Sequence, residues 1–264
     1  MTTIMTELIV IRHGETDWNR EHRFQGQIDV PLNAAGRAQA ERLARRLASE
    51  PFDVVVASDL QRAHATAQAA AGERPIEADP LWREQAFGVA EGLDAPTIAQ
   101  QHPELWARWL CHDADFALPG GGESVRMFHE RVLRGLQRVV RAHAGRRVAV
   151  FTHGGVLDML WRAAHKQTLH GARTCEIPNT GINRLRWHDG ALQVVQWADA
   201  AHLEGLPAQP DTTPLGVQSA QPLGVQSAQP LGVQSAQPLG VQSPQPVGVH
   251  SAAPLGALAP LPAP

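Results

Sequence analysis

Two short segments far apart in the chain carry side chains that could handle a phosphate group. RHGET at 12–16 follows an apolar run at 8–11, and THGG at 152–155 follows another at 148–151. Apolar runs of this length are typical of buried parallel strands, whose carboxyl ends hold the active sites of open α/β sheets. An arginine precedes the first histidine, and a guanidinium binds phosphate while repelling metal ions. The two segments therefore predict one site for an anionic ligand.

The first segment extends to RHGETDWN at 12–19, which resembles the signature of the histidine phosphatase superfamily, also called the phosphoglycerate-mutase-like family. Eight elements of the family pattern occur in the family's order, which is far more specific than a single Arg-His-Gly. The resemblance covers residues 7–203. After the signature come FQG at 24–26, PLN at 31–33, SDLQRA at 58–63, LWRE at 81–84, GGES at 121–124, THGG at 152–155 and NTGIN at 179–183.

The resemblance assigns a role to five residues. His13 would be the nucleophile, since a neutral imidazole attacks phosphorus readily near pH 7 and forms a phosphohistidine. Arg12 and Arg62 would grip the phosphoryl oxygens. His153 would be held cationic by the bound phosphate and stabilise charge on the transferring group. Glu84 matches the general acid and base, which protonates the leaving oxygen and later deprotonates the attacking water.

Further residues are expected to contact the phosphate or the substrate. Turn hydrogen bonds are an equally good explanation for several of them. The candidates are Thr16, Asn19, Gln25, Gly26 and Gly154.

Other carboxylates and a metal compete with this assignment. Glu15 and Glu91 are rivals for the acid–base role, and Glu15 lies inside the first motif, which favours a structural role. A metal site built from His13, His153 and Glu84 is the second alternative. Two arginines in the same pocket would repel a cation, so neither a metal nor another cofactor is expected.

The residue pattern predicts an α/β fold, a three-layer sandwich of a mostly parallel sheet with helices on both faces. Asn33 and Ser58 are predicted to cap helices, the second of which carries Arg62. Asp189-Gly190 suits the tight turn of a hairpin over 181–197. Strands are expected at 8–12, 54–57 and 148–151, and helices at 33–49, 58 onward, 96–110, 124 onward and 156–164.

Composition excludes several classes of protein. The net charge of −3 gives no basic field for nucleic acid or an anionic membrane. Two cysteines build neither a disulfide framework nor a zinc site, which fits a reducing compartment. The first seven residues show no signal-peptide pattern, so a cytoplasmic location is expected. The sequence does not predict an oligomeric state.

The last part of the chain differs from the rest. Residues 1–206 are predicted to form the histidine phosphatase domain, and 207–264 a low-complexity tail. Prolines at 214, 222, 230, 238, 246 and 254 mark an octapeptide repeat rich in Pro, Gly and Gln. Proline removes a donor from every repeat, and almost no charge is present, so a disordered tail is predicted. Removing everything after Leu206 is then expected to leave the rate unchanged.

Three functions fit these patterns. The first is a metal-independent phosphomonoester hydrolase acting on a small phosphorylated metabolite. The second is a 2,3-bisphosphoglycerate-dependent phosphoglycerate mutase, which uses the same residues but returns the phosphoryl group to the substrate. The third is an inactive module that binds phosphorylated ligands, against which intact His13 and Glu84 argue. Mutases of the family carry a longer insertion between Glu84 and Ser124 that excludes water, and the compact stretch here favours hydrolysis.

Overall fold

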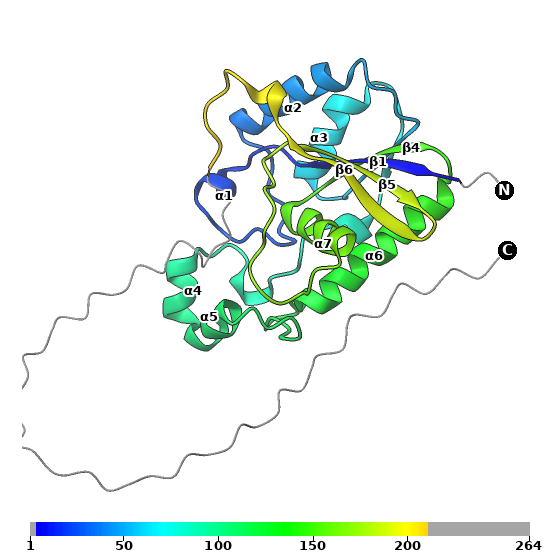
Figure 1. The fold of residues 1–264 in the computed structure, drawn as a ribbon. Helices are drawn as coiled ribbons and strands as arrows, with labels where there is room; N and C mark the ends of the chain where they lie inside the picture. Colours follow the sequence, from blue (N-terminus) through cyan, green and yellow to red (C-terminus); the bar gives the residue numbers. More distant parts are fainter. Residues whose placement is uncertain (1–3, 211–264) are drawn as a thin grey trace, which may run out of the picture.

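A computed structural model describes residues 4–210 as a six-stranded sheet packed between helices (Figure 1). The strand order is β3-β2-β4-β1-β5-β6. The first four pair in parallel, whereas β5 and β6 form the expected antiparallel hairpin. The predicted mostly parallel sheet is confirmed. The strands are β1 (Thr6–Arg12), β2 (Val54–Ala57), β3 (Ile76–Ala78), β4 (Arg147–Thr152), β5 (Ile182–His188) and β6 (Ala191–Asp199).

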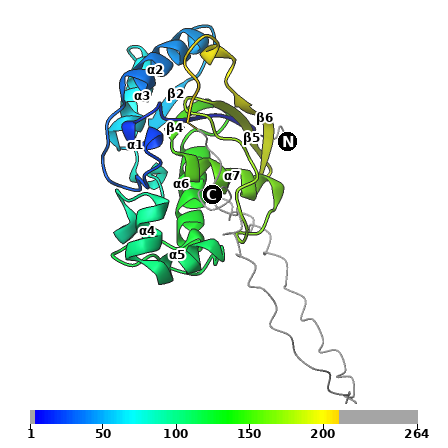
Figure 2. The same cartoon turned by 90° about the vertical axis from the view of Figure 1, so that its left-hand side faces the viewer.

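Helices cover both faces of the sheet, as a three-layer sandwich requires. Figures 1 and 2 show α2 and α3 on one face and α6 and α7 on the other. The α-helices are α1 (Asp17–Arg20), α2 (Ala34–Leu47), α3 (Gln61–Ala71), α4 (Ala95–Gln101), α5 (Pro103–Leu110), α6 (Val125–Ala142) and α7 (Gly154–His165). Short 3-10 turns are η1 (Pro80–Trp82), η2 (Gly88–Ala90) and η3 (Ala201–Leu203).

Strand alternation explains the two cores. Along β1, Ile9 and Ile11 join the core with Leu43 of α2, whereas Leu8 and Val10 join the core with α6 and α7. Successive side chains of a strand point to opposite faces, so a central strand must be apolar at every position. This is why the uninterrupted apolar run at 8–11 predicts a strand covered on both sides.

Asn33 caps a helix as predicted, and Ser124 caps the helix that was expected from residue 124 onward. The Asn33 side chain accepts a hydrogen bond from Gly36 N at 2.8 Å, and α2 begins at the next residue. Ser124 accepts from Met127 N at 3.1 Å and starts α6, whose buried face carries Phe128, Val132, Leu136 and Val139. These caps satisfy backbone donors that the first helical turn leaves open.

The expected single helix over 96–110 is two helices. α4 ends at Gln101, and α5 begins at Pro103. His102 between them is not helical, with φ −133° and ψ 60°, because the ring of the following proline disfavours the helical conformation. The pair packs on a small separate core, and Figure 2 shows it at one end of the molecule, below α1.

Within residues 4–210, no helix combines the length and the apolar character needed to cross a membrane. Of the predicted tail at 207–264, residues 207–210 are described and contact the domain, whereas residues 211–264 lie outside the described residues, so their disorder stays a prediction.

Candidate active site

Strand register brings the two histidines together. β1 and β4 pair in parallel with Arg12 opposite Thr152, so the next residue of each strand leaves the same edge of the sheet. The His13 and His153 rings lie with centroids 5.1 Å apart. The backbone reinforces this placement, since His13 N donates to Thr152 O at 2.8 Å. Segments that are 140 residues apart in sequence therefore form one site, as predicted.

His13 has the proton arrangement of a nucleophile. Its Nδ1 lies 2.7 Å from Gly14 O, which can only accept, so Nδ1 carries the proton and Nε2 keeps a free lone pair. Burial, with help from Arg62 and Arg12, lowers the His13 pKa well below its usual value. The imidazole is therefore neutral near pH 7 and can attack an electrophile.

His153 is fully buried next to His13, and it is not among the described residues that line the pocket. Its Nε2 lies 2.8 Å from Ser58 Oγ, and its Nδ1 has no hydrogen-bond partner within the described part of the chain. Burial, Arg62 and His13 lower its pKa. A phosphoryl dianion would act in the opposite direction, so the predicted cation requires a bound ligand.

Ser58 does not cap the helix that carries Arg62, which corrects the sequence-based expectation. α3 begins at Gln61 after the N-cap residue Leu60. Asp29 from a distant loop accepts from Gln61 N at 2.7 Å and takes the capping role. The Ser58 hydroxyl is thereby available to orient His153.

Arg12 and Arg62 are buried, and both line the pocket. Arg12 donates to Ile177 O at 2.7 Å, and Arg62 donates to Ile28 O and Gly26 O at 2.9 and 2.7 Å. The Nε of each has no hydrogen-bond partner among the described residues. Burial lowers both pKa values to about 10, so both stay charged at pH 7. Buried cations with donors left over are a site for an anion.

Glu84 lies in the pocket wall after η1. Its Oε1 accepts from Gln85 N at 2.9 Å and its Oε2 from Gly155 N at 3.0 Å. Gly155 is in the first turn of α7, where open backbone donors attract negative charge. A Cβ at Gly155 would lie 2.2 Å from Glu84 Oε1, so only glycine lets the carboxylate approach this closely.

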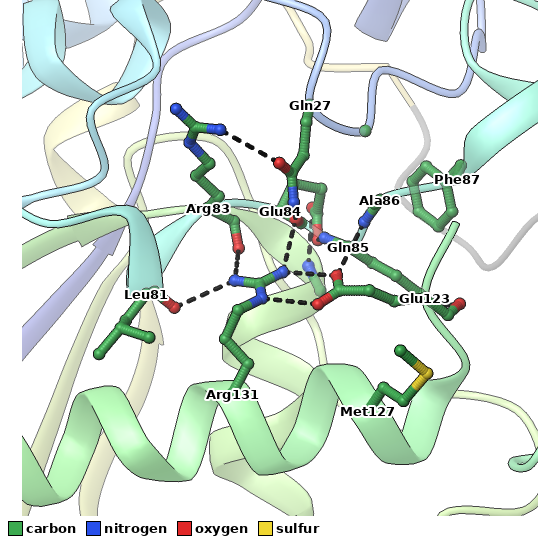
Figure 3. Close-up of polar contacts among 12 residues, drawn as sticks. Gln27, Leu81, Arg83, Glu84, Gln85, Ala86, Phe87, Glu123, Met127 and Arg131 are labelled. Carbon is green, nitrogen blue, oxygen red and sulfur yellow. Dashed lines mark hydrogen bonds and ion pairs between the residues drawn. The ribbon is translucent and has the colours of Figure 1, made fainter. Parts of the chain in front are cut away.

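Arg131 of α6 holds the backbone around Glu84, and the sequence analysis missed it. Figure 3 shows its guanidinium among three carbonyl groups, with Nη1 donating to Leu81 O and Arg83 O at 3.1 and 2.8 Å and Nη2 to Glu84 O at 2.9 Å. Glu123 of the GGES segment pairs with Arg131 at 2.7 Å and accepts from Ala86 N at 3.0 Å. The pair fixes the segment that carries Glu84.

A family model described as histidine phosphatase superfamily (branch 1) matches residues 8–200. The chain belongs to this superfamily. Phosphoglycerate mutase-like protein 4 of Arabidopsis thaliana is 41% identical over 204 residues, covering 75% of this chain and 87% of the relative. Metal-independent phosphoserine phosphatase of A. thaliana is 35% identical over 207 residues, with 76% and 85% covered. The solved structure of Bacillus stearothermophilus YhfR is similar, with a TM-score of 0.69, 32% identity, and 75% and 100% covered.

The rival carboxylates of this histidine phosphatase are engaged elsewhere. Glu15 is fully buried, where its Oε1 meets Arg20 at 2.5 Å and Asn33 at 2.8 Å. Glu91 accepts from two backbone amides, those of residues 27 and 87, at 3.0 and 2.9 Å. Neither is among the described residues that line the pocket. Both carboxylates therefore stabilise the loops around the site.

The expected secondary contacts divide into two groups. Thr16 is buried and caps α1 through a reciprocal pair of bonds with Asn19, so it supports the loop and does not line the pocket. The rest lie in the pocket wall, which places them within reach of a ligand. They are Asn19, Gln25, Gly26 and Gly154.

The pocket is a cavity of about 290 Å³ with two contrasting walls. Phe24, Phe87 and Trp109 form an apolar wall, with ring centroids 5.1 to 5.8 Å apart in edge-to-face contacts. The other wall is charged and includes Arg162 and Arg173, which the sequence analysis did not single out.

Within residues 4–210, no three His, Cys, Asp or Glu side chains cluster as metal ligands would.

Arg162 organises the charged wall. It is buried, pairs with Asp158 at 3.1 Å, and donates to Thr168 O and Gly171 O at 2.6 and 3.0 Å. These bonds fold the loop after α7 against the helix. Arg173 lies two residues beyond the anchored loop and lines the pocket. The sequence offers no reason to select Arg173, because no recognisable motif surrounds this arginine.

Proposed function

We propose that this histidine phosphatase hydrolyses phosphomonoesters through a phosphohistidine at His13. The observation that carries the proposal is the protonation geometry of His13. Its Nδ1 is bonded to Gly14 O, so Nε2 is the nucleophilic nitrogen, and the buried Arg12 and Arg62 line the same pocket. Arg12 and Arg62 bind the phosphoryl oxygens and neutralise their charge in the role that a metal fills elsewhere.

The first half-reaction transfers the phosphoryl group to the enzyme. Nε2 of His13 attacks phosphorus, the N–P bond forms, and the ester P–O bond breaks. Glu84 donates its proton to the departing oxygen, so an alcohol leaves instead of an alkoxide. His153 and the two arginines stabilise charge on the transferring group.

The second half-reaction returns the enzyme to its starting state. A water molecule attacks the phosphohistidine, Glu84 accepts a proton from that water, and the N–P bond breaks to release inorganic phosphate. His13 is again neutral, and Glu84 again carries a proton. The bonds from Gly155 N and Gln85 N hold the carboxylate in one place for both steps.

Hydrolysis is favoured over the mutase alternative by the segment between Glu84 and Ser124. Its α-helices, α4 and α5, have only 7 and 8 residues and pack on their own small core. A mutase must keep water from the phosphohistidine until the substrate takes the group back. The inactive binding module remains the third hypothesis, and the placement of Glu84 in the pocket wall argues against it.

The substrate we propose is a small metabolite that carries a second anionic group, such as a carboxylate. Arg173 lines the pocket together with Arg12 and Arg62. Burial lowers the pKa of Arg12, and the charge of Arg173 lowers it further. Arg173 lies in the pocket wall in addition to the two arginines that bind the phosphoryl group, and its position suits a carboxylate of the substrate. The metal-independent phosphoserine phosphatase among the relatives supports this class.

The test is a screen of phosphate release over phosphorylated metabolites, with and without 2,3-bisphosphoglycerate. We expect hydrolysis without that compound, an acid-labile and base-stable phosphoenzyme, and loss of both in His13→Ala. Phosphoserine and phosphoethanolamine differ only in the carboxylate, so their ratio of kcat/KM reports the second anion site. Strong turnover that depends on 2,3-bisphosphoglycerate, with negligible phosphate release, would reverse the choice in favour of the mutase.

A further inference from the structure

The chain returns to the active site after the last strand. From the end of β6 it passes through η3, which packs against α2, and continues to residue 210. In Figure 1 this gold segment descends from the top of the molecule to α1. Pro210 lines the same pocket as His13. The family match ends at residue 200, so this return lies beyond the matched region.

Gln209 binds the loop beside the site through both ends of its amide. Its Oε1 accepts from Asn179 N at 2.7 Å, and its Nε2 donates to Asn179 O at 3.0 Å. The Gln209 amide thereby binds both the backbone N–H and the backbone C=O of Asn179, as the backbone of a neighbouring β-strand would. Glutamine is suited to this because one side chain must supply a donor and an acceptor together.

Asn179 passes this restraint to the nucleophile. Its side chain donates from Nδ2 to the backbone oxygen of His13 at 3.0 Å, in a buried position. The next residue, Thr180, donates its backbone N–H to Arg12 O at 3.1 Å. Both residues of the turn are therefore bonded to the segment that presents His13.

The turn is strained, which explains why it needs a restraint. Thr180 has φ +54°, a left-handed conformation that is unfavourable for a β-branched residue. Its hydroxyl lies 3.2 Å from His202 Nε2, so the returning segment holds Thr180 as well as Asn179. Without these contacts the turn can relax, and relaxation would move the carbonyl of His13.

We propose that Gln209 is a positioning residue for His13, acting through Asn179 on the backbone of the nucleophile. The inference builds on the proposed function, since it gives His13 a geometry that matters only if His13 reacts. A small displacement of a nucleophile from the attack geometry lowers the rate of transfer while leaving ground-state binding largely intact. Substitution at Gln209 therefore lowers kcat and leaves KM nearly unchanged.

The experiment uses full-length Gln209→Ala and Gln209→Glu. Alanine removes both bonds, whereas glutamate has the same size but cannot donate to Asn179 O when ionised. Gln193→Ala, at an exposed position on β6, is the matched control. Two measurements are made on each variant: steady-state kinetics on phosphoserine, and amide hydrogen exchange of the peptides that cover residues 12–16 and 178–182.

We expect kcat to fall about tenfold in both Gln209 variants, with KM within about twofold. Exchange should be faster in the 12–16 peptide as well as in 178–182, whereas the control matches the wild type. If the wild type shows no phosphatase activity but the Gln209 variants exchange faster in both peptides, the positioning inference is supported. Only the proposed function is then overturned. An active wild type whose Gln209→Ala variant keeps both its kcat and its 12–16 exchange overturns the positioning inference alone.

Discussion

Glu84 and Gly155 come within 3.0 Å of each other, carboxylate oxygen to backbone nitrogen, and the contact joins two parts of the fold. Glu84 follows a short 3-10 turn, whereas Gly155 lies in the first turn of the helix that follows His153. The position of the acid–base candidate is thus tied to the strand that carries the second histidine. Helix α7 orients both groups from one end.

Gly155→Ala should lower activity without a matching loss of stability. The new Cβ would lie 2.2 Å from Glu84 Oε1 and 3.0 Å from Phe128, so the carboxylate must move. We expect kcat to fall by about 100-fold, as happens when a catalytic group is misplaced by an ångström. Alanine favours a helix over glycine by roughly 1 kcal/mol, so Tm should not fall in parallel. A Tm loss without a kcat loss would contradict this account of Gly155.

Stability should decrease as the pH falls below about 6.5, the pKa of an unperturbed histidine. Burial lowers the pKa of His13 and of His153, so the unfolded chain binds protons that the folded chain refuses. Stability is then complete above about 6.5 and is lost on acidification. Each such group contributes up to about 1.4 kcal/mol per pH unit. Urea unfolding at pH 7 and pH 5 measures the slope.

The control for this pH dependence is the double variant His13→Asn/His153→Gln, which removes both titrating rings. Its stability should vary less between pH 7 and pH 5. His129 and His202 also have lowered pKa values through burial, so a residual slope is expected. An unaltered slope in the double variant would show that the two active-site histidines are not the source.

Arg131→Met should destabilise the protein by about 3 kcal/mol or more, because it leaves Glu123 as a largely buried charge without its partner. The two side chains are only 11% and 16% exposed. Arg134→Met on the same helix is the control. Adding Glu123→Gln to Arg131→Met should recover part of the loss, and chemical denaturation of the wild type, of Arg131→Met, of Glu123→Gln and of the double variant gives the coupling. Purely additive losses would mean that the pair is not coupled.

Two truncations should behave differently. A chain ending at Pro210 keeps every contact described here, so its rate and Tm should match the full chain. A chain ending at Leu206 lacks Gln209 and should lose kcat as Gln209→Ala does. This revises the expectation from sequence that a cut after Leu206 is silent. Equal kinetics for the two truncated chains would restore the sequence-based expectation.

Chelation should leave phosphatase activity intact. In the proposed mechanism, Arg12 and Arg62, which are buried and line the pocket, neutralise the phosphoryl oxygens without a divalent ion. Steady-state rates with and without EDTA are the measurement, and Arg62→Met is the companion variant, for which we expect a large rise in KM and a fall in kcat. Activity that disappears in EDTA and returns with a divalent ion would contradict the mechanism.

Local sequence determined the framework of this protein. The apolar runs at 8–11 and 148–151 predicted buried strands, Asn33 was predicted as a helix cap, and a helix was expected from residue 124 onward, all of which the structure contains. These features depend on neighbours in sequence, because strand alternation and capping are local. The histidine-containing segments could also be paired in advance, since parallel strands of one sheet end at a common edge.

Tertiary structure decided which side chains serve the site. Arg131 and Arg134 are neighbours on one helix with similar sequence surroundings, and only the packing of α6 against η1 brings Arg131 to the backbone of Glu84. Ser58 had the sequence pattern of a helix cap, yet it contacts His153 at the end of the neighbouring strand. Gln209 meets a turn 30 residues earlier in the chain. Such contacts join residues that are distant in sequence. Their partners depend on how the helices, strands and loops pack, so these contacts leave no periodic pattern in the sequence.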